Sequence, residues 1–152
     1  MTPKRLFATF AFAEAVTWTL LILGMILEYG VQATELGVRI GGGVHGFVFL
    51  TYCVVTVLVG TSQRWSLGRI MVGLVAAVVP YATIPFEIAT RRRGLLFGEW
   101  QLRRGARPAR HWFDRLCRWA ISNPWLAVVV GVVVVSVVFV GLLMLGPPIS
   151  TG

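Results

Sequence analysis

Residues 125–145 read WLAVVVGVVVVSVVFVGLLML, and this stretch contains no charged side chain. The hydrocarbon core of a bilayer is about 30 Å thick, and an α-helix crosses it in about 20 residues. A water-soluble fold rarely needs an uncharged apolar run of this length, so the stretch predicts a transmembrane helix. Residues 6–27, LFATFAFAEAVTWTLLILGMIL, form a second such run and contain a single acid, Glu14.

Two more apolar segments lie between these runs, at about residues 42–60 and 70–88. The chain has 152 residues, of which 57% are hydrophobic, and a soluble domain of this size could not hide so much apolar surface. We therefore predict an all-α integral membrane protein built as a small bundle of four transmembrane helices. Pro80 and Pro85 leave open whether the third helix is kinked or re-entrant.

The segment before the last span has the pattern of an amphipathic helix. Trp112, Phe113, Leu116, Trp119 and Ala120 recur at helical spacing, which predicts an interfacial helix with its aromatic rings in the headgroup layer. The surface expected to meet lipid or a partner consists of Arg110, Trp112, Arg115, Arg118 and Trp119. The predicted division is a three-span membrane domain (1–92), an Arg-rich linker with the amphipathic helix (93–124), and a C-terminal transmembrane helix with a short tail (125–152).

The formal net charge is +8, and residues 89–124 alone contain nine arginines. Because these arginines adjoin apolar spans, they favour anionic lipid headgroups as partners over nucleic acid. The positive-inside rule predicts a multi-pass protein of the cell membrane with a cytoplasmic linker. Lys4, Arg5, Arg64 and Arg69 favour the same side, which three full crossings before the linker cannot satisfy. Either the N-terminus lies outside or the third span is re-entrant.

Ionisable residues inside spans are costly and therefore mark possible sites. In a bundle of three full crossings, His45 and Glu87 fall at one depth near an interface, with Arg39 and Glu28 close by. Glu14 lies at a different depth, as a separate buried acid. A His–carboxylate pair indicates either a proton-linked or ligand-coordinating site, or a hydrogen-bonded pair that locks two spans together.

Small residues at regular spacing begin the second span. Gly42 and Gly46 are spaced for close helix contact, and Tyr52 continues the face of His45. This face lines either a cavity or, as we favour, a packed helix interface. We predict no metal or other cofactor, because neither His nor Cys pairs occur at ligand spacing. Triads, Cys–His dyads and paired carboxylates at suggestive spacing are also missing from the sequence, so we expect no enzymatic activity.

Several short motifs together resemble the small bacterial integral-membrane proteins of domain-of-unknown-function family 3817, over about residues 4–92. The motifs are Phe12-Ala13-Glu14-Ala15, Tyr29, Arg39-Ile40-Gly41, His45-Gly46, Tyr52, Arg64-Trp65-Ser66-Leu67, Pro80-Tyr81 and Phe86-Glu87. The resemblance implies a three-span membrane domain and brings no known catalytic residues. This chain differs in having Glu28 where members often have Lys, and in adding the linker and a further span.

The small size, the glycine-lined faces and the missing catalytic set lead to one functional expectation. We expect a non-enzymatic accessory subunit of a larger bacterial membrane complex, such as a respiratory or transport assembly, whose partners are other membrane protein subunits. The alternative is a small proton-linked carrier or channel, in the form of a homo-oligomer, that uses Glu14 and the layer of His45 and Glu87.

Overall fold

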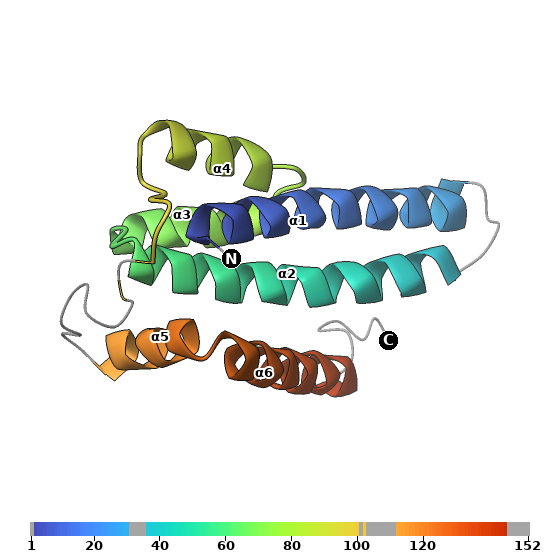
Figure 1. Ribbon diagram of the computed structural model, residues 1–152. Coiled ribbons are helices and arrows are strands. Elements are labelled where there is room, and N and C mark those ends of the chain that lie inside the picture. The colour runs from blue at the N-terminus through green and yellow to red at the C-terminus, as the bar shows by residue number, and fades with distance from the viewer. Residues whose placement is uncertain (1, 31–35, 101, 103–111, 146–152) are drawn as a thin grey trace.

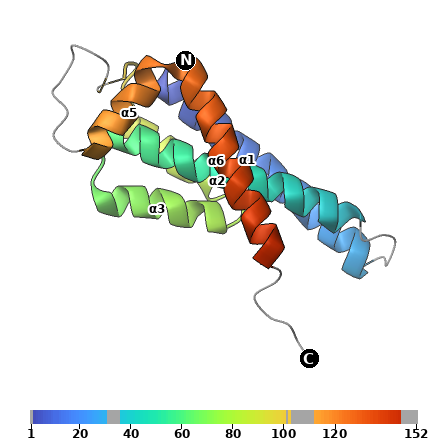
Figure 2. The same cartoon turned by 90° about the horizontal axis from the view of Figure 1, so that it is seen from below.

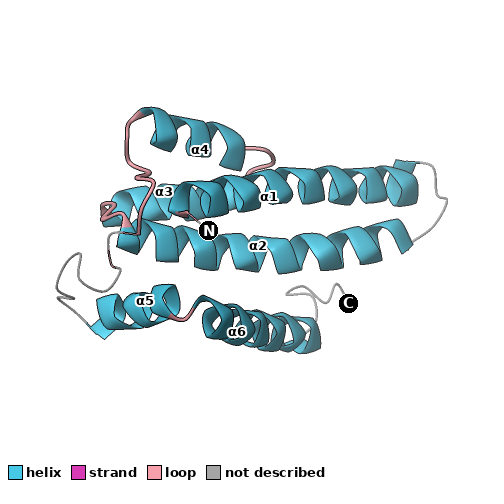
Figure 3. Cartoon of the chain, in the orientation of Figure 1, coloured by secondary structure: helices cyan, strands magenta, loops and turns pink. Residues whose placement is uncertain are grey.

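The structure, a computed structural model, describes residues 2–30, 36–100, 102 and 112–145. In these residues it contains helices, turns and loops but no strand (Figure 1, Figure 3). Three helical segments are long and apolar enough to cross a membrane, at residues 3–30, 36–62 and 125–142. The all-α membrane class is therefore confirmed. The elements are α1 (Pro3–Met25), a π-helical turn η1 (Ile26–Gly30), α2 (Leu36–Ser62), α3 (Leu67–Val78), α4 (Thr83–Arg92), α5 (Trp112–Ser122) and α6 (Pro124–Leu145).

Helices α1 and α2 form an antiparallel pair that defines the long axis of the molecule (Figure 1). Glycines allow the two backbones to approach at the η1 end. A Cβ on Gly24 would lie 2.6 Å from the carbonyl carbon of Gly37, and one on Gly41 would lie 3.1 Å from the carbonyl oxygen of Leu20. Since lipid gives helices little hydrophobic reason to associate, close backbone packing of this kind supplies much of their attraction.

The third predicted span is a helical hairpin and not one continuous helix. Helix α3 has 12 residues and is about 18 Å long, which is too short for the bilayer core. Val79 is extended, as residues before proline usually are, and Tyr81 takes a left-handed φ of 63°. Helix α4 then runs back beside α3 (Figure 1). The sequence left open whether the third span is kinked or re-entrant, and the structure shows an interrupted helix that turns back as a hairpin, whose tip we define as residues 79–82.

The hairpin removes the conflict over charge. Because α4 returns to the end at which α3 began, the start of α1, the α2–α3 turn, the end of α4 and helix α5 all lie at one end of the bundle (Figure 1). Of the two solutions left open by the sequence, the re-entrant third span is the one the structure adopts. We call this the basic end; its cationic residues include Lys4, Arg5, Arg64, Arg69, Arg91, Arg92 and Arg93.

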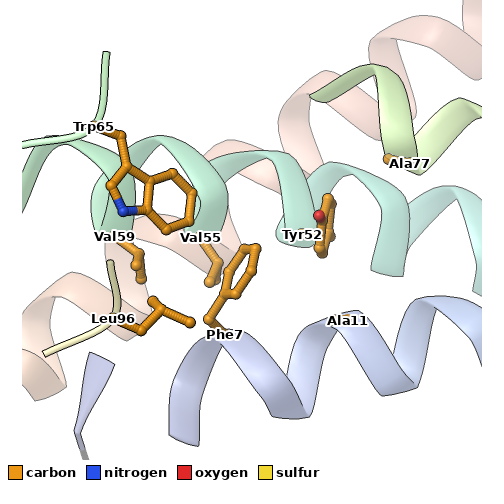
Figure 4. Close-up of a cluster of buried hydrophobic side chains, with 8 residues drawn as sticks. All are labelled: Phe7, Ala11, Tyr52, Val55, Val59, Trp65, Ala77 and Leu96. Carbon is orange, nitrogen blue, oxygen red and sulfur yellow. The ribbon is translucent and has the colours of Figure 1, made fainter. Parts of the chain in front are cut away.

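Aromatic rings fix the hairpin to α1 and α2 near the basic end. The rings of Phe7, Trp65 and Phe86 meet edge to face, with centroids 5.4–6.1 Å apart. The indole Nε1 of Trp65 donates to the carbonyl of Leu95 at 2.8 Å, which holds the chain leaving α4 against the same cluster. Gly73 leaves room for this packing, since a Cβ there would lie 2.9 Å from the Phe86 ring. Figure 4 shows the buried core around Phe7.

The predicted amphipathic helix forms as α5 and packs on α2 through one face. Its buried residue is Cys117, a free thiol whose pKa is raised by burial to about 11, so it serves as a small packing group at neutral pH. Trp112, Leu116 and Trp119 face outward and are exposed. Helix α6 then crosses α2 obliquely and exposes most of its side chains (Figure 2).

A topology experiment follows from the hairpin. In a chain whose Cys53 and Cys117 are replaced by Ala, we expect Arg64→Cys and Arg93→Cys to react with a membrane-impermeant maleimide from the same side. Tyr29→Cys, which is exposed at the η1 end, should react from the opposite side. The measurement compares labelling in intact spheroplasts and inverted vesicles. Labelling of positions 64 and 93 from opposite sides would mean that α3 and α4 cross the membrane fully.

Candidate functional site

The most unusual buried group is the carboxylate of Glu14, in the middle of α1. Its side chain is 0% exposed, and neither of its oxygens has a hydrogen-bond partner among the described residues. The imidazole of His45, on α2, lies beside it, with Nδ1 3.8 Å from Glu14 Oε1. Buried polar groups without partners are rare and costly, so an unsatisfied carboxylate at this depth marks a functional candidate.

Thr17 lies between the backbone of Glu14 and the imidazole of His45. Thr17 Oγ1 donates to the carbonyl oxygen of Glu14 at 3.0 Å and lies 3.2 Å from His45 Nδ1. Which of Thr17 Oγ1 and His45 Nδ1 donates in the second contact depends on the tautomer of the imidazole. An acid and a base therefore share one buried corner.

An indole connects the pair to the hairpin. The rings of Trp18 and His45 lie with centroids 4.5 Å apart, and Phe49 borders the imidazole at 6.2 Å. Trp18 Nε1 donates to the carbonyl oxygen of Ala77 at 3.2 Å, in the last turn of α3. The indole ring packs against the imidazole at an interplanar angle of 53°, while its N–H holds the end of a short helix.

Two more bonds tie the hairpin to α1 on either side of Glu14. Thr83 Oγ1, at the start of α4, donates to the carbonyl oxygen of Ala11 at 3.0 Å. The hydroxyls of Thr19 and Tyr81 lie 3.3 Å apart. Helix α1 therefore anchors the hairpin through the residues that surround Glu14. We define the acid–histidine site as Glu14, Thr17, Trp18 and His45.

Buried hydroxyls extend the polar surroundings along α2. Tyr52 and Thr56 are fully buried, and neither hydroxyl makes a hydrogen bond of standard geometry with the described protein atoms. Proton exchange between neighbouring acid, imidazole and hydroxyl groups is the chemistry that such an arrangement can support. Groups of three or more metal-binding side chains do not occur among the residues that the structure describes.

The predicted layer of His45, Glu87, Arg39 and Glu28 is not formed. Glu87 is buried on α4 and lies 3.8 Å from Arg91 Nε, one turn along the same helix, instead of beside His45. The prediction assumed that residues 70–88 cross the membrane, whereas the hairpin returns Glu87 to the basic end. Arg39 is exposed and Glu28 half-buried at the η1 end, and no ion pair joins them within the described chain. Glu14, expected to stand alone, is the partner of His45.

The predicted packing residues occupy three different environments. Gly46 lies under the ring of Phe139 from α6, where a Cβ would be 3.0 Å from Cε2. A Cβ on Gly42 would be in ordinary contact with Leu21, at 3.8 Å. Tyr52 packs in the core, its ring centroid 5.8 Å from that of Phe7.

The predicted lipid or partner surface is mostly outward-facing where it is described. Trp112, Arg115 and Trp119 are exposed on α5, and Arg118 is half-buried. Arg110 lies outside the described residues. Exposed aromatic rings beside arginines on an amphipathic helix are typical of a headgroup layer or of a protein contact.

Comparison with known proteins places this arrangement in a family. The chain matches DUF3817, a domain of unknown function, over residues 4–92, and it belongs to that family. It is 31% identical over 91 residues to an uncharacterised membrane protein of Bacillus subtilis, YdzA; the match covers 59% of this chain and 94% of YdzA. It is also 50% identical over 93 residues to a protein of Streptomyces coelicolor named as a membrane protein, SCO5905. That match covers 60% of this chain but only 11% of SCO5905. No solved structure matches significantly.

Replacing Glu14 by its uncharged isostere tests the character of the pair. We expect Glu14→Gln to be at least as stable as the wild type in detergent, because it removes a buried charge without changing the shape of the side chain. His45→Ala should cost about 2 kcal/mol or more, because it empties the space between Trp18 and Phe49. Chemical unfolding followed by tryptophan fluorescence measures both, with Glu28→Gln as control. A loss above about 1 kcal/mol for Glu14→Gln would show that the ionised pair is net stabilising.

Proposed function

We propose that this chain is a non-enzymatic accessory subunit of a larger bacterial membrane protein complex, such as a respiratory or transport assembly. The observation that carries the proposal is the size of the matching segment in the Streptomyces protein, of which it makes up 11%. There, a segment 50% identical to this chain is covalently joined to a much longer polypeptide. A domain that is fused to a larger protein in one organism is well suited to associate with one non-covalently in another.

The surface of the chain supports the same reading. Helix α6 contacts α2 through the Phe139–Gly46 contact and leaves most of its valines exposed, among them Val128, Val133 and Val137. The exposed rings of α5 continue this surface at the basic end. An apolar helix that covers so little of its own domain can contact a neighbouring subunit along most of its length.

The orientation we propose is multi-pass in the cell membrane, with the basic end and the Arg-rich linker in the cytoplasm. The cationic groups at the basic end come from α1, the α2–α3 turn, α4 and α5. The excess of Arg and Lys beside spans is retained on the cytoplasmic side. Anionic headgroups of the inner leaflet would then face these groups.

Exchange of α6 tests the accessory role. The chain is purified from native membranes in mild detergent, and the mass of the complex is measured. We expect co-purifying subunits with the wild type, and their loss when residues 124–145 are replaced by an unrelated Leu/Ala span of equal length. The exchange keeps the length and apolar character of the span while removing its specific face. Retention of the same subunits by the exchanged chain would contradict α6 docking, and a wild type that purifies alone would contradict the accessory role.

The acid–histidine site favours a second candidate, a small proton-linked carrier or channel that assembles as a homo-oligomer. A re-entrant hairpin places non-helical backbone at membrane depth, and membrane proteins tolerate such backbone where it is buried in protein or lines a cavity. Here the hairpin tip is bonded to the same stretch of α1 that carries Glu14. A proton taken up by Glu14 or His45 would alter charge directly beside these bonds.

Proton flux distinguishes the second candidate. In proteoliposomes that contain a pH-sensitive dye, Glu14→Gln and His45→Ala are expected to abolish a flux that the wild type supports. Glu87→Gln is the matched control, because Glu87 is also a buried acid and pairs with Arg91 on its own helix. A wild type without flux, or equal flux in all variants, removes the carrier hypothesis.

A further inference from the structure

A groove of about 410 Å³ lies between the two arms of the re-entrant hairpin, at the basic end. Its walls come from the start of α3 and the end of α4, so the hairpin itself creates the groove. Ser66 and Arg69 form one side, Phe86 and Arg93 the other, and Val72 and Ala89 are among the remaining wall residues. The groove is separate from the acid–histidine site and from the exposed rings of α5.

The polar part of the groove is positive. Arg69 and Arg93 are far apart in the sequence and converge because α4 runs back beside α3. The lining contains no acid, and the nearest carboxylate on α4, Glu87, pairs with Arg91. Within the described chain, neither Arg69 nor Arg93 forms an ion pair of its own. Two guanidinium groups without an ion pair around one space favour an anion between them, and Arg matches phosphate geometry especially well.

The start of α3 adds to this field. Ser66 caps the helix, its Oγ accepting from the backbone N–H of Arg69 at 3.4 Å. The first turn of a helix carries partial positive charge, which favours a phosphate placed beside it. This partial charge adds to that of Arg69 on the same side of the groove.

The other part of the groove is apolar. Val72, Phe86 and Ala89 form this part, and 58% of the surface of Val72 is exposed. A ligand that fills the whole groove must combine an anionic group with a hydrocarbon chain. Basic pockets between membrane helices on the cytoplasmic side are known to take acidic lipid headgroups for this reason.

We propose that the groove between α3 and α4 is a binding site for an anionic phospholipid. The phosphate lies between Arg69 and Arg93, and the first part of an acyl chain packs along Val72 and Phe86. The bound lipid neutralises two like charges at the ends of the hairpin and so holds its two arms together.

The test measures lipid retention by the full chain. The protein is extracted in mixed micelles that contain equal amounts of phosphatidylglycerol and phosphatidylcholine, and bound lipid is counted by native mass spectrometry. We expect the wild type to retain phosphatidylglycerol at least tenfold over phosphatidylcholine. Arg69→Gln/Arg93→Gln should lose that preference. The control Arg5→Gln/Arg92→Gln removes the same charge from exposed residues at the same end, and should retain lipid within about twofold of the wild type.

A steric variant keeps the test decisive if the double variant fails to fold. Ala89→Trp leaves every charge in place but fills the groove, and it should also lose phosphatidylglycerol at least tenfold. Equal losses in the double variant and its control would show only a general basic surface and overturn the site. Full retention in Ala89→Trp would overturn it as well. Displacement of the lipid by millimolar inorganic phosphate would mean that the arginines select a free anion rather than a phospholipid.

Discussion

A polypeptide that turns back inside a bilayer must give the polar groups of its turn to protein, because the lipid offers them no hydrogen bonds. The α3–α4 hairpin meets this constraint with internal turn bonds and with a donor from α1. Trp18 on α1 donates to the carbonyl oxygen of Ala77 at the end of α3, and the hydroxyl of Thr83 at the start of α4 donates in turn to the carbonyl oxygen of Ala11 on α1. The turn itself is closed by the N–H of Ala82, which donates to the carbonyl of Val79 at 3.1 Å. The rest of the architecture depends on this solution, because without it residues 70–88 would have to cross the membrane.

The hairpin also decides where charge can lie. With both of its ends at the basic end, the arginines of the α2–α3 turn and of the end of α4 share one side with Lys4 and Arg5. One element thereby produces three consequences. The described chain has three helical segments long and apolar enough to cross a membrane, most of its described cationic residues lie at the basic end, and two distant arginines, Arg69 and Arg93, border one groove. A straight third span would have separated those two arginines by the thickness of the membrane.

Sequence reasoning predicted the elements that depend on local pattern and missed the contacts that depend on this turn. The long apolar runs and the amphipathic pattern from Trp112 to Ala120 follow from periodicity, and they correspond to α1, α2, α5 and α6. Pro80 and Pro85 left the course of the third span open, and it forms α3 and α4. The pairing of His45 with Glu87 failed because depth was counted along an assumed continuous helix. The better signal was on α1, where Glu14, Thr17 and Trp18 fall on one helical face. That face predicts a shared site but cannot say which span supplies its partner, since this requires the register between α1 and α2 that glycines 24, 37 and 41 set in three dimensions.

The same turns of α1 carry both the charge of the site and the bonds that hold the hairpin tip, and this coincidence has a physical consequence. Glu14 lies between Ala11, which accepts from Thr83, and Trp18, which donates to Ala77. Protonation of the carboxylate or the imidazole changes the field across both bonds, because neither group is shielded by water. The groups of α1 that anchor the hairpin tip form hydrogen bonds and are therefore polar. An α1 with only apolar side chains would not anchor the tip better. Burying the carboxylate of Glu14 costs free energy and does not help to hold the tip. Such a cost persists only where the ionised or the protonated form of the group has a function.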